Sequence, residues 1–422
     1  MNIRMSIILS TGIIMARYGY DQMPPTLWLI LLLVMTSMAI VLRKWIQSQC
    51  ILFYICLFLL GGLLTSYQEC RNRKPVTYFT MDELSEQDRF LTTAQERRAE
   101  IEQKLMGLGI ENEDFGVIAA MAMGDKTALD KDTKEVYSVA GASHVLAVSG
   151  LHISIIFQLL IMLLGGNRRH IFVILSALVA IWMYVLFIGM PASAVRSATM
   201  LSVYGFVTMT RRNKNSLRSL SIAFTIMLLC NPLYLFDLSF QMSFAAVGSI
   251  IVFLPLLSSL YHPTHRLSQW IWGMLCVSAA AQIGTLPLIT YYFGRISCYS
   301  LLTTFIAIPA ATGILYLCCM LMLMSPFLLL SPTVSLFSWL ITWVAKALVV
   351  ITHFANTAFH LTSLAPGASI DGIHLPLPIL FIIYAALGLV YAGWIKMKRI
   401  RNKMARSQED FSPENALFTN YR

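Results

Sequence analysis

Long apolar runs separated by short polar turns make up most of the chain. Most runs approach the roughly 20 residues with which a helix crosses a bilayer. The candidate spans are Ile3–Arg17, Thr26–Leu42, Ile51–Tyr67, Val145–Leu164, Ile171–Ile188, Ala192–Thr210, Leu217–Cys230, Leu238–Leu257, Trp270–Tyr292, Leu301–Met324, Val334–Ala358 and Leu375–Met397. The pattern predicts an all-α polytopic membrane protein with about 11–12 transmembrane helices, several of them broken or re-entrant. No small-residue cleavage site follows the first run, which we interpret as a helix rather than a signal peptide.

Composition supports the membrane class. Apolar residues make up 57% of the chain and charged residues only 12%, about half the roughly 25% charged share of soluble domains. These values exclude soluble globular, disordered, collagen-like and disulfide-scaffold proteins. The eight cysteines follow no metal-binding spacing, and we predict no metal site and no cofactor. A disulfide among Cys70, Cys230 and Cys298 is left open by the sequence.

The net charge of +10 comes largely from basic loops. Basic residues hold loops on the cytoplasmic side of a membrane. The loops at Arg43–Lys44, Arg168–Arg169 and Arg211–Lys214 and the tail Lys396–Arg406 are therefore predicted to be cytoplasmic, and both termini with them. The basic group Arg71–Lys74 falls outside in this topology, and we accept it as an exception because the reverse orientation violates the other loops.

One long polar segment interrupts the spans. Residues 68–140 lie outside the cytoplasm in this topology, and Ala94–Leu108 has the pattern of an amphipathic helix, lying on the membrane surface or packed as a solvated helix on its neighbours. The predicted division of the chain is N-terminal transmembrane helices at 1–67, the extracytoplasmic segment at 68–140, a membrane channel domain at 141–397 and a basic cytoplasmic tail at 398–422.

Polar side chains gather at the predicted outer ends of the spans. His144, Ser149 and His152 enter an apolar helix, and Ser149 and His152 are three residues apart on one helix face. Polar groups at membrane depth usually face a bundle interior or a wet cavity. The simpler alternative is local, with Ser149 bonding a backbone group and a histidine capping the helix.

A second set of polar residues follows along the chain. Arg196 lies inside a span, where an isolated arginine is costly, and Asp237 is its most plausible internal partner. Gln241 and Gln282 complete the set. Aromatic residues such as Phe240 and Phe244 can stack on bases. The predicted breaks in or between helices are Gly150, Gly189, Pro191, Pro232, Pro287 and Gly294.

Broken helices at a shared depth indicate a translocation path. Exposed helix N-termini together with Arg196 favour an anion. The residues alone therefore predict a pathway open to the outside, for an anionic polymer or solute. A carrier of another anionic solute or lipid remains an alternative. An intramembrane serine hydrolase, with Ser149 as nucleophile and His353 or His360 as base, is a weaker one.

The same residues resemble a known family. The run His144-Val-Leu-Ala-Val-Ser-Gly-Leu-His152 is similar to the core motif of the ComEC competence family, bacterial channels that admit transforming DNA. Further matches follow in order from Glu96 to Ile395: Met123–Asp125, Gly189–Pro191, Arg196–Met200, Asp237–Phe244, Thr285–Pro287 and Tyr292–Gly294.

The resemblance implies a channel subunit that conducts one DNA strand across the bacterial cytoplasmic membrane. The pathway-lining or DNA-contacting residues would be His144, Ser149, His152, Arg196, Asp237, Gln241 and Gln282, with no catalytic residue. The segment at Gln68–Thr93 is too short for the family's OB-like domain, and no run fits its metallo-β-lactamase-like nuclease domain. The implied partners are single-stranded DNA, the lipid bilayer, a separate nuclease, and a cytoplasmic motor or DNA-binding proteins. Homo-oligomerisation is left open.

Overall fold

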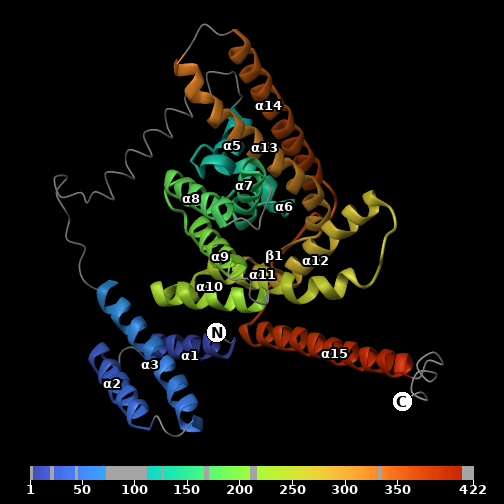
Figure 1. Ribbon diagram of the computed structural model, residues 1–422. Coiled ribbons are helices and arrows are strands. Elements are labelled where there is room, and N and C mark those ends of the chain that lie inside the picture. Colours follow the sequence, from blue (N-terminus) through green and yellow to red (C-terminus); the bar gives the residue numbers. More distant parts are fainter. Residues whose placement is uncertain are drawn as a thin grey trace, which may run out of the picture. The chain divides into compact units, whose positions relative to one another are not determined.

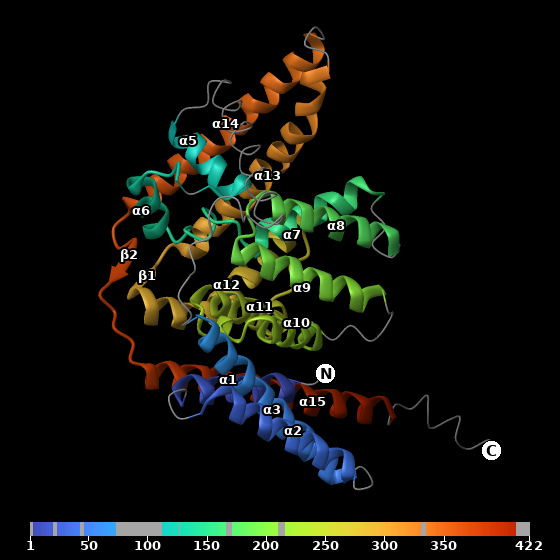
Figure 2. The same ribbon diagram turned by 90° about the vertical axis from the view of Figure 1, so that its left-hand side faces the viewer.

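The computed structural model describes residues 3–19, 23–42, 46–72, 112–125, 127–165, 171–209, 216–330 and 335–410 (Figures 1 and 2). These residues form fourteen α-helices, two single-turn helices of other types and two three-residue strands. The all-α class predicted from the apolar pattern is confirmed.

Each of the twelve predicted spans corresponds to a helix. These helices are α1 (Ile3–Tyr18), α2 (Pro25–Val41), α3 (Ile46–Asn72), α7 (Gly150–Leu163), α8 (Ile171–Phe187), α9 (Ala192–Met209), α10 (Ser216–Cys230), α11 (Leu238–Ser258), α12 (Arg266–Phe293), α13 (Ser300–Leu330), α14 (Ser335–Ser363) and α15 (Leu377–Asp410). Among the described residues, six helices are long and apolar enough to cross a membrane, namely α3 and α11–α15. Four more, α2, α7, α8 and α10, are apolar but shorter.

The remaining elements are short. The segment between α3 and α7 contains α5 (Asn112–Ile118), the π-helical turn η3 (Ala119–Met123) and α6 (Lys131–Val139), and the 3-10 helix η4 (Pro232–Phe236) lies between α10 and α11. Strands β1 (Arg295–Ser297) and β2 (Ser369–Asp371) pair with each other. The predicted amphipathic stretch Ala94–Leu108 lies outside the described residues, as do the basic loops at 43–45, 166–170 and 210–215. The predicted functional division of the chain stays a prediction.

The chain forms two compact units. The first comprises residues 1–244 and 297–369, and the second comprises 245–296 and 370–422, so that one boundary falls within α11. In the first unit, η3 is fully buried, and its residues pack in one large apolar core with side chains of α7, α8, α13 and α14. In the second unit, the Tyr384 hydroxyl of α15 donates to the Gly284 carbonyl of α12 at 2.6 Å. Helix α12 continues through Pro287 and ends at Gly294, whose φ of 63° suits glycine.

Helices α1 and α3 approach each other through glycines. A Cβ atom on Gly12 would overlap the carbonyl oxygen of Phe58, and one on Gly61 would lie 2.6 Å from the Leu9 carbonyl oxygen. Small residues let membrane helices pack backbone against backbone. The pair is further joined by an ion pair between Arg17 and Glu69. The close packing of α1 against α3 therefore depends on glycines, which have no side chain.

We predict that Gly12→Ala destabilises the protein. The added methyl group must displace the backbone of α3, and overpacking of this kind costs about 1–3 kcal/mol. The measurement is the thermal unfolding midpoint of the purified protein in detergent. Gly388→Ala on α15 is the matched control, because nothing lies within 4 Å of a Cβ at that position. Equal midpoints for the two variants would contradict the packing account.

Candidate functional site

Helix α7 begins with a local polar pair. The Ser149 backbone N–H donates to His152 Nδ1 at 3.1 Å, and the Ser149 hydroxyl lies 2.8 Å from the same nitrogen. A nitrogen that accepts from a backbone N–H is unprotonated, so the hydroxyl also donates to it and the imidazole proton is assigned to Nε2. His152 is fully buried. This is the local capping arrangement that the sequence left open.

The histidine that contacts Ser149 differs from the bases named in the hydrolase alternative. The base expected for Ser149 was His353 or His360, but Ser149 contacts His152 instead, and His353 Nδ1 lies 3.6 Å from Asp114 Oδ2. His152 Nε2 has no hydrogen-bond partner among the described residues. A base that takes the serine proton needs an orienting group to stabilise its charge. The described residues provide none here.

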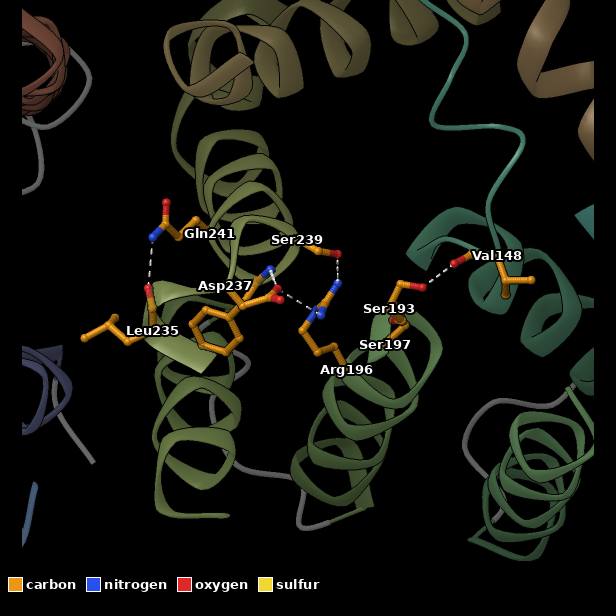
Figure 3. Close-up of polar contacts among 9 residues, drawn as sticks. Val148, Ser193, Arg196, Ser197, Leu235, Asp237, Ser239 and Gln241 are labelled. Carbon is orange, nitrogen blue, oxygen red and sulfur yellow. Dashed lines mark hydrogen bonds and ion pairs between the residues drawn. The ribbon is translucent and has the colours of Figure 1, made fainter. Parts of the chain in front are cut away.

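The start of α9 lies against the start of α7. Gly189 has a φ of 82° and Met190 one of 54°, so the chain turns sharply between α8 and α9. The Ser193 hydroxyl donates to the Val148 carbonyl at 2.5 Å, just before α7 begins (Figure 3). A Cβ on Gly150 would lie 3.0 Å from the Ser197 hydroxyl oxygen, so the two helix starts are in close contact.

Arg196 joins α9 to the start of α11. Its side chain is 3% exposed. Nη2 donates to the Ser239 hydroxyl, and Nη1 lies 3.8 Å from Asp237 Oδ1, as Figure 3 shows. The ion pair between Arg196 and Asp237 expected from the sequence is therefore present. Asp237 also caps α11, because its Oδ1 accepts from the Phe240 backbone N–H at 2.8 Å.

Two side chains at the start of α11 contact other parts of the protein. Gln241 Nε2 donates to the Leu235 carbonyl of η4 at 3.0 Å (Figure 3). Phe240 is 1% exposed and packs against Phe224, Phe244 and Tyr234. The expectation that Phe240 stacks on bases is therefore wrong, because its ring is already buried against other aromatic side chains.

The first unit thus brings together three helix N-termini. The Ser193 contact joins the start of α9 to that of α7, and the Arg196 contact joins it to the start of α11. Helix N-termini carry partial positive charge and unpaired N–H groups. Three buried donors nearby, Arg196 Nε, Arg196 Nη1 and His152 Nε2, have no hydrogen-bond partner among the described residues. The cluster is electropositive and retains hydrogen-bond donors.

Two predicted site residues make none of the hydrogen bonds described above. His144 is exposed, in the loop between α6 and α7, close enough to His152 to interact with it electrostatically. Gln282 lies in α12, within the second unit, whereas the other predicted residues belong to the first. Sequence reasoning did not select Ser193, Ser197 or Ser239 as site residues, although the four-residue spacing of Ser193 and Ser197 places both on one face of α9.

A second polar network was not predicted. The Tyr137 hydroxyl of α6 donates to Asn356 Oδ1 of α14 at 2.6 Å, and Asn356 Nδ2 donates to Asp114 Oδ1 of α5 at 2.7 Å. Tyr137 is 1% exposed and Asp114 is 4% exposed. Burial raises the pKa of Tyr137 above its usual range, and the charge of Asp114 raises it further. The network fastens α5 and α6 to α14.

Metal and disulfide chemistry find no support in the described part of the chain. It contains no group of three or more His, Cys, Asp or Glu side chains able to hold a metal ion. All eight cysteines, which include Cys70, Cys230 and Cys298, are free thiols.

Comparisons with known proteins point to one family. Residues 121–397 match the family described as competence protein. Over 252 residues the chain is 30% identical to ComE operon protein 3 of Bacillus subtilis (strain 168), covering 57% of this chain and 30% of that protein. Over 233 residues it is 24% identical to Recombination protein 2 of Haemophilus influenzae, covering 51% of this chain and 28% of that protein. The chain thus matches under a third of the length of each relative. No solved structure matches the chain.

We predict that Tyr137→Phe lowers stability at neutral pH and flattens its decline at high pH. The lost hydrogen bond contributes about 1 kcal/mol. Because the folded-state pKa of Tyr137 is raised, its contribution is complete below the unfolded-state pKa of about 10 and is lost as pH rises above that value. Thermal unfolding midpoints of both proteins between pH 7 and pH 11 test this, and parallel curves would contradict it.

Proposed function

The chain belongs to the competence protein family, and we propose that it forms a channel for single-stranded transforming DNA across the bacterial cytoplasmic membrane. The observation that carries the proposal is the family match over residues 121–397, which agrees with the resemblance seen in the sequence. Six long apolar helices and four shorter ones support a multi-pass membrane protein.

The electrostatics of the first unit support an anionic substrate. A single DNA strand carries one negative charge per nucleotide, and a path through hydrocarbon must supply compensating dipoles or cations. Three helix N-termini meet around Arg196, through Ser193 and Ser239. Each N-terminus carries roughly half a positive charge. Their convergence at a buried arginine favours an anion over a cation or a neutral solute.

The unpaired donors support the same assignment. A buried N–H group without an acceptor costs about 1–3 kcal/mol, yet within the described part of the chain Arg196 has two such groups and His152 has one. Phosphate oxygens are strong acceptors for guanidinium groups. In the proposal, local opening of the cluster lets a phosphate reach these donors, with Asp237, whose side chain is 45% exposed, leaving Nη1 as the phosphate arrives.

The remaining predicted residues are assigned by position. We assign His144, Ser149, His152 and Gln241 to the outer mouth, and Gln282 of the second unit to the pathway wall. Both termini are proposed to be cytoplasmic. These 422 residues contain no phosphate-binding G-x-x-x-x-G-K-[ST] motif. The proposal therefore assigns directionality to a partner motor or a gradient, and degradation of the second strand to a partner nuclease.

We predict that Arg196→Ala lowers transformation by about tenfold or more, since a charge-assisted hydrogen bond contributes about 1.5–3 kcal/mol. The assay is transformation frequency in cells expressing the variant as the only copy, normalised to its abundance in the membrane. Arg196→Lys should recover part of the loss, because it keeps the charge but not the planar fork.

Arg266→Ala is the matched control, because Arg266 is an exposed arginine at the start of α12. Wild-type transformation by Arg196→Ala at normal abundance would remove Arg196 from the mechanism. Normal transformation after deletion of the gene would remove the whole proposal and favour a carrier of another anionic solute.

A further inference from the structure

One exposed face of α14 carries a lysine among apolar residues. Trp339, Trp343, Lys346, Val350 and Phe354 are separated by three or four positions and are all exposed, so they form one helix face. The opposite face is buried in the core, through Ile341, Val344, Ala345 and Leu348. Helices α13 and α14 lie side by side (Figure 1). Lys346 therefore points away from the protein interior.

Lys346 lies within a candidate membrane span. In the part of α14 whose side chains are described, the span covers Trp339 to Ser363, and Lys346 follows Trp339 by seven residues, about 10 Å along the helix axis. An ammonium group at this depth is unfavourable unless it reaches the interface or meets an anion. Position and exposure together indicate a group that faces the lipid and needs a counter-charge.

The side chain runs back toward the start of the span. The Lys346 Nζ lies 5.5 Å from the centre of the Trp343 ring, one turn nearer the N-terminus of α14. Trp343 in turn meets Trp339 edge to face, with ring centres 5.9 Å apart. Paired tryptophans are typical of the headgroup level of a membrane, and lysines extend toward that level. The amino group is thus held beside an aromatic pair suited to the interface.

Among the described residues, no carboxylate pairs with Lys346. The described chain after Ser138 carries carboxylates only at Asp237, Asp371, Glu409 and Asp410. Before Ser138, Asp114 of α5 packs against α14, where it faces Asn356 and His353. Asp237 pairs with Arg196 and Asp371 with Arg295. A second copy meeting the same face would bring another Lys346, which repels the first. The bilayer, by contrast, supplies phosphates at this level.

We propose that Trp339, Trp343 and Lys346 bind the headgroup phosphate of an anionic phospholipid. Lys346 neutralises the phosphate, the tryptophan pair lies beside it at the headgroup level, and Val350 and Phe354 contact the acyl chains. The inference is independent of DNA uptake, because it rests on an outward face of α14 that the proposed pathway does not use.

Native mass spectrometry of the full chain tests this, with phosphatidylglycerol and phosphatidylcholine of matched acyl chains titrated into the purified protein. We expect wild type to retain phosphatidylglycerol preferentially and Lys346→Gln to lose about fivefold in apparent affinity, the contribution of one basic residue near a membrane surface. Lys346→Arg should retain the preference. Trp343→Leu should weaken it, since the ring that holds the amino group is gone.

Lys131→Gln is the matched control, because Lys131 is an exposed lysine at the start of α6, outside the candidate membrane spans. An equal loss in Lys131→Gln would mean that net charge alone retains lipid and would overturn the site. So would the absence of a preference for phosphatidylglycerol in wild type. If wild type forms a dimer that Lys346→Gln does not form, this face of α14 binds a second copy of the chain. If Lys346→Gln retains lipid normally but no longer binds a single-stranded oligonucleotide, the face binds DNA. Either result overturns the lipid assignment.

Discussion

The buried guanidinium of Arg196 is the constraint on which the first unit depends. A charged group that is 3% exposed needs partners, and Arg196 finds them in Ser239 and Asp237 at the start of α11. Asp237 in turn caps α11 through the Phe240 N–H. The charge on α9 therefore fixes where the neighbouring helix begins. Among the described residues, two guanidinium nitrogens have no hydrogen-bond partner, and these are the donors that the proposal assigns to a transient anion.

Small polar residues make this arrangement possible. Ser193 reaches the carbonyl of Val148, and Gly150 leaves room for Ser197. Larger side chains at these positions would separate the starts of α7 and α9 and weaken the shared positive potential, which falls off within a turn of the helix end. The serines do not need to contact substrate in order to matter, since they hold three helix dipoles at one place.

Much of the fold could be predicted from the sequence, because twelve apolar runs with polar or glycine and proline ends leave the helix as the only stable state in lipid. The ion pair of Arg196 was predictable for a related reason, since few acids were available to it. The partner of Ser149 and the burial of Phe240 were not, because both depend on which side of a helix the neighbours cover. The contact of Asp114 with Asn356 joins residues 242 positions apart, and no local sequence pattern predicts it.

The outward orientation of Lys346 could not be predicted from the sequence either. In the sequence Lys346 is a single charge in an apolar run, and the mean hydropathy of its span remains that of a membrane helix. Only the packing of α14 shows that Ile341 and Leu348 face the core while Lys346 and its tryptophans face outward. Arg196 and Lys346 thus have contrasting surroundings. Arg196 is enclosed and neutralised by groups of the protein, whereas Lys346 is turned outward, where the surroundings must neutralise it. The enclosed arginine holds neighbouring helices together. The outward lysine, as proposed, binds the protein to lipid headgroups of the bilayer.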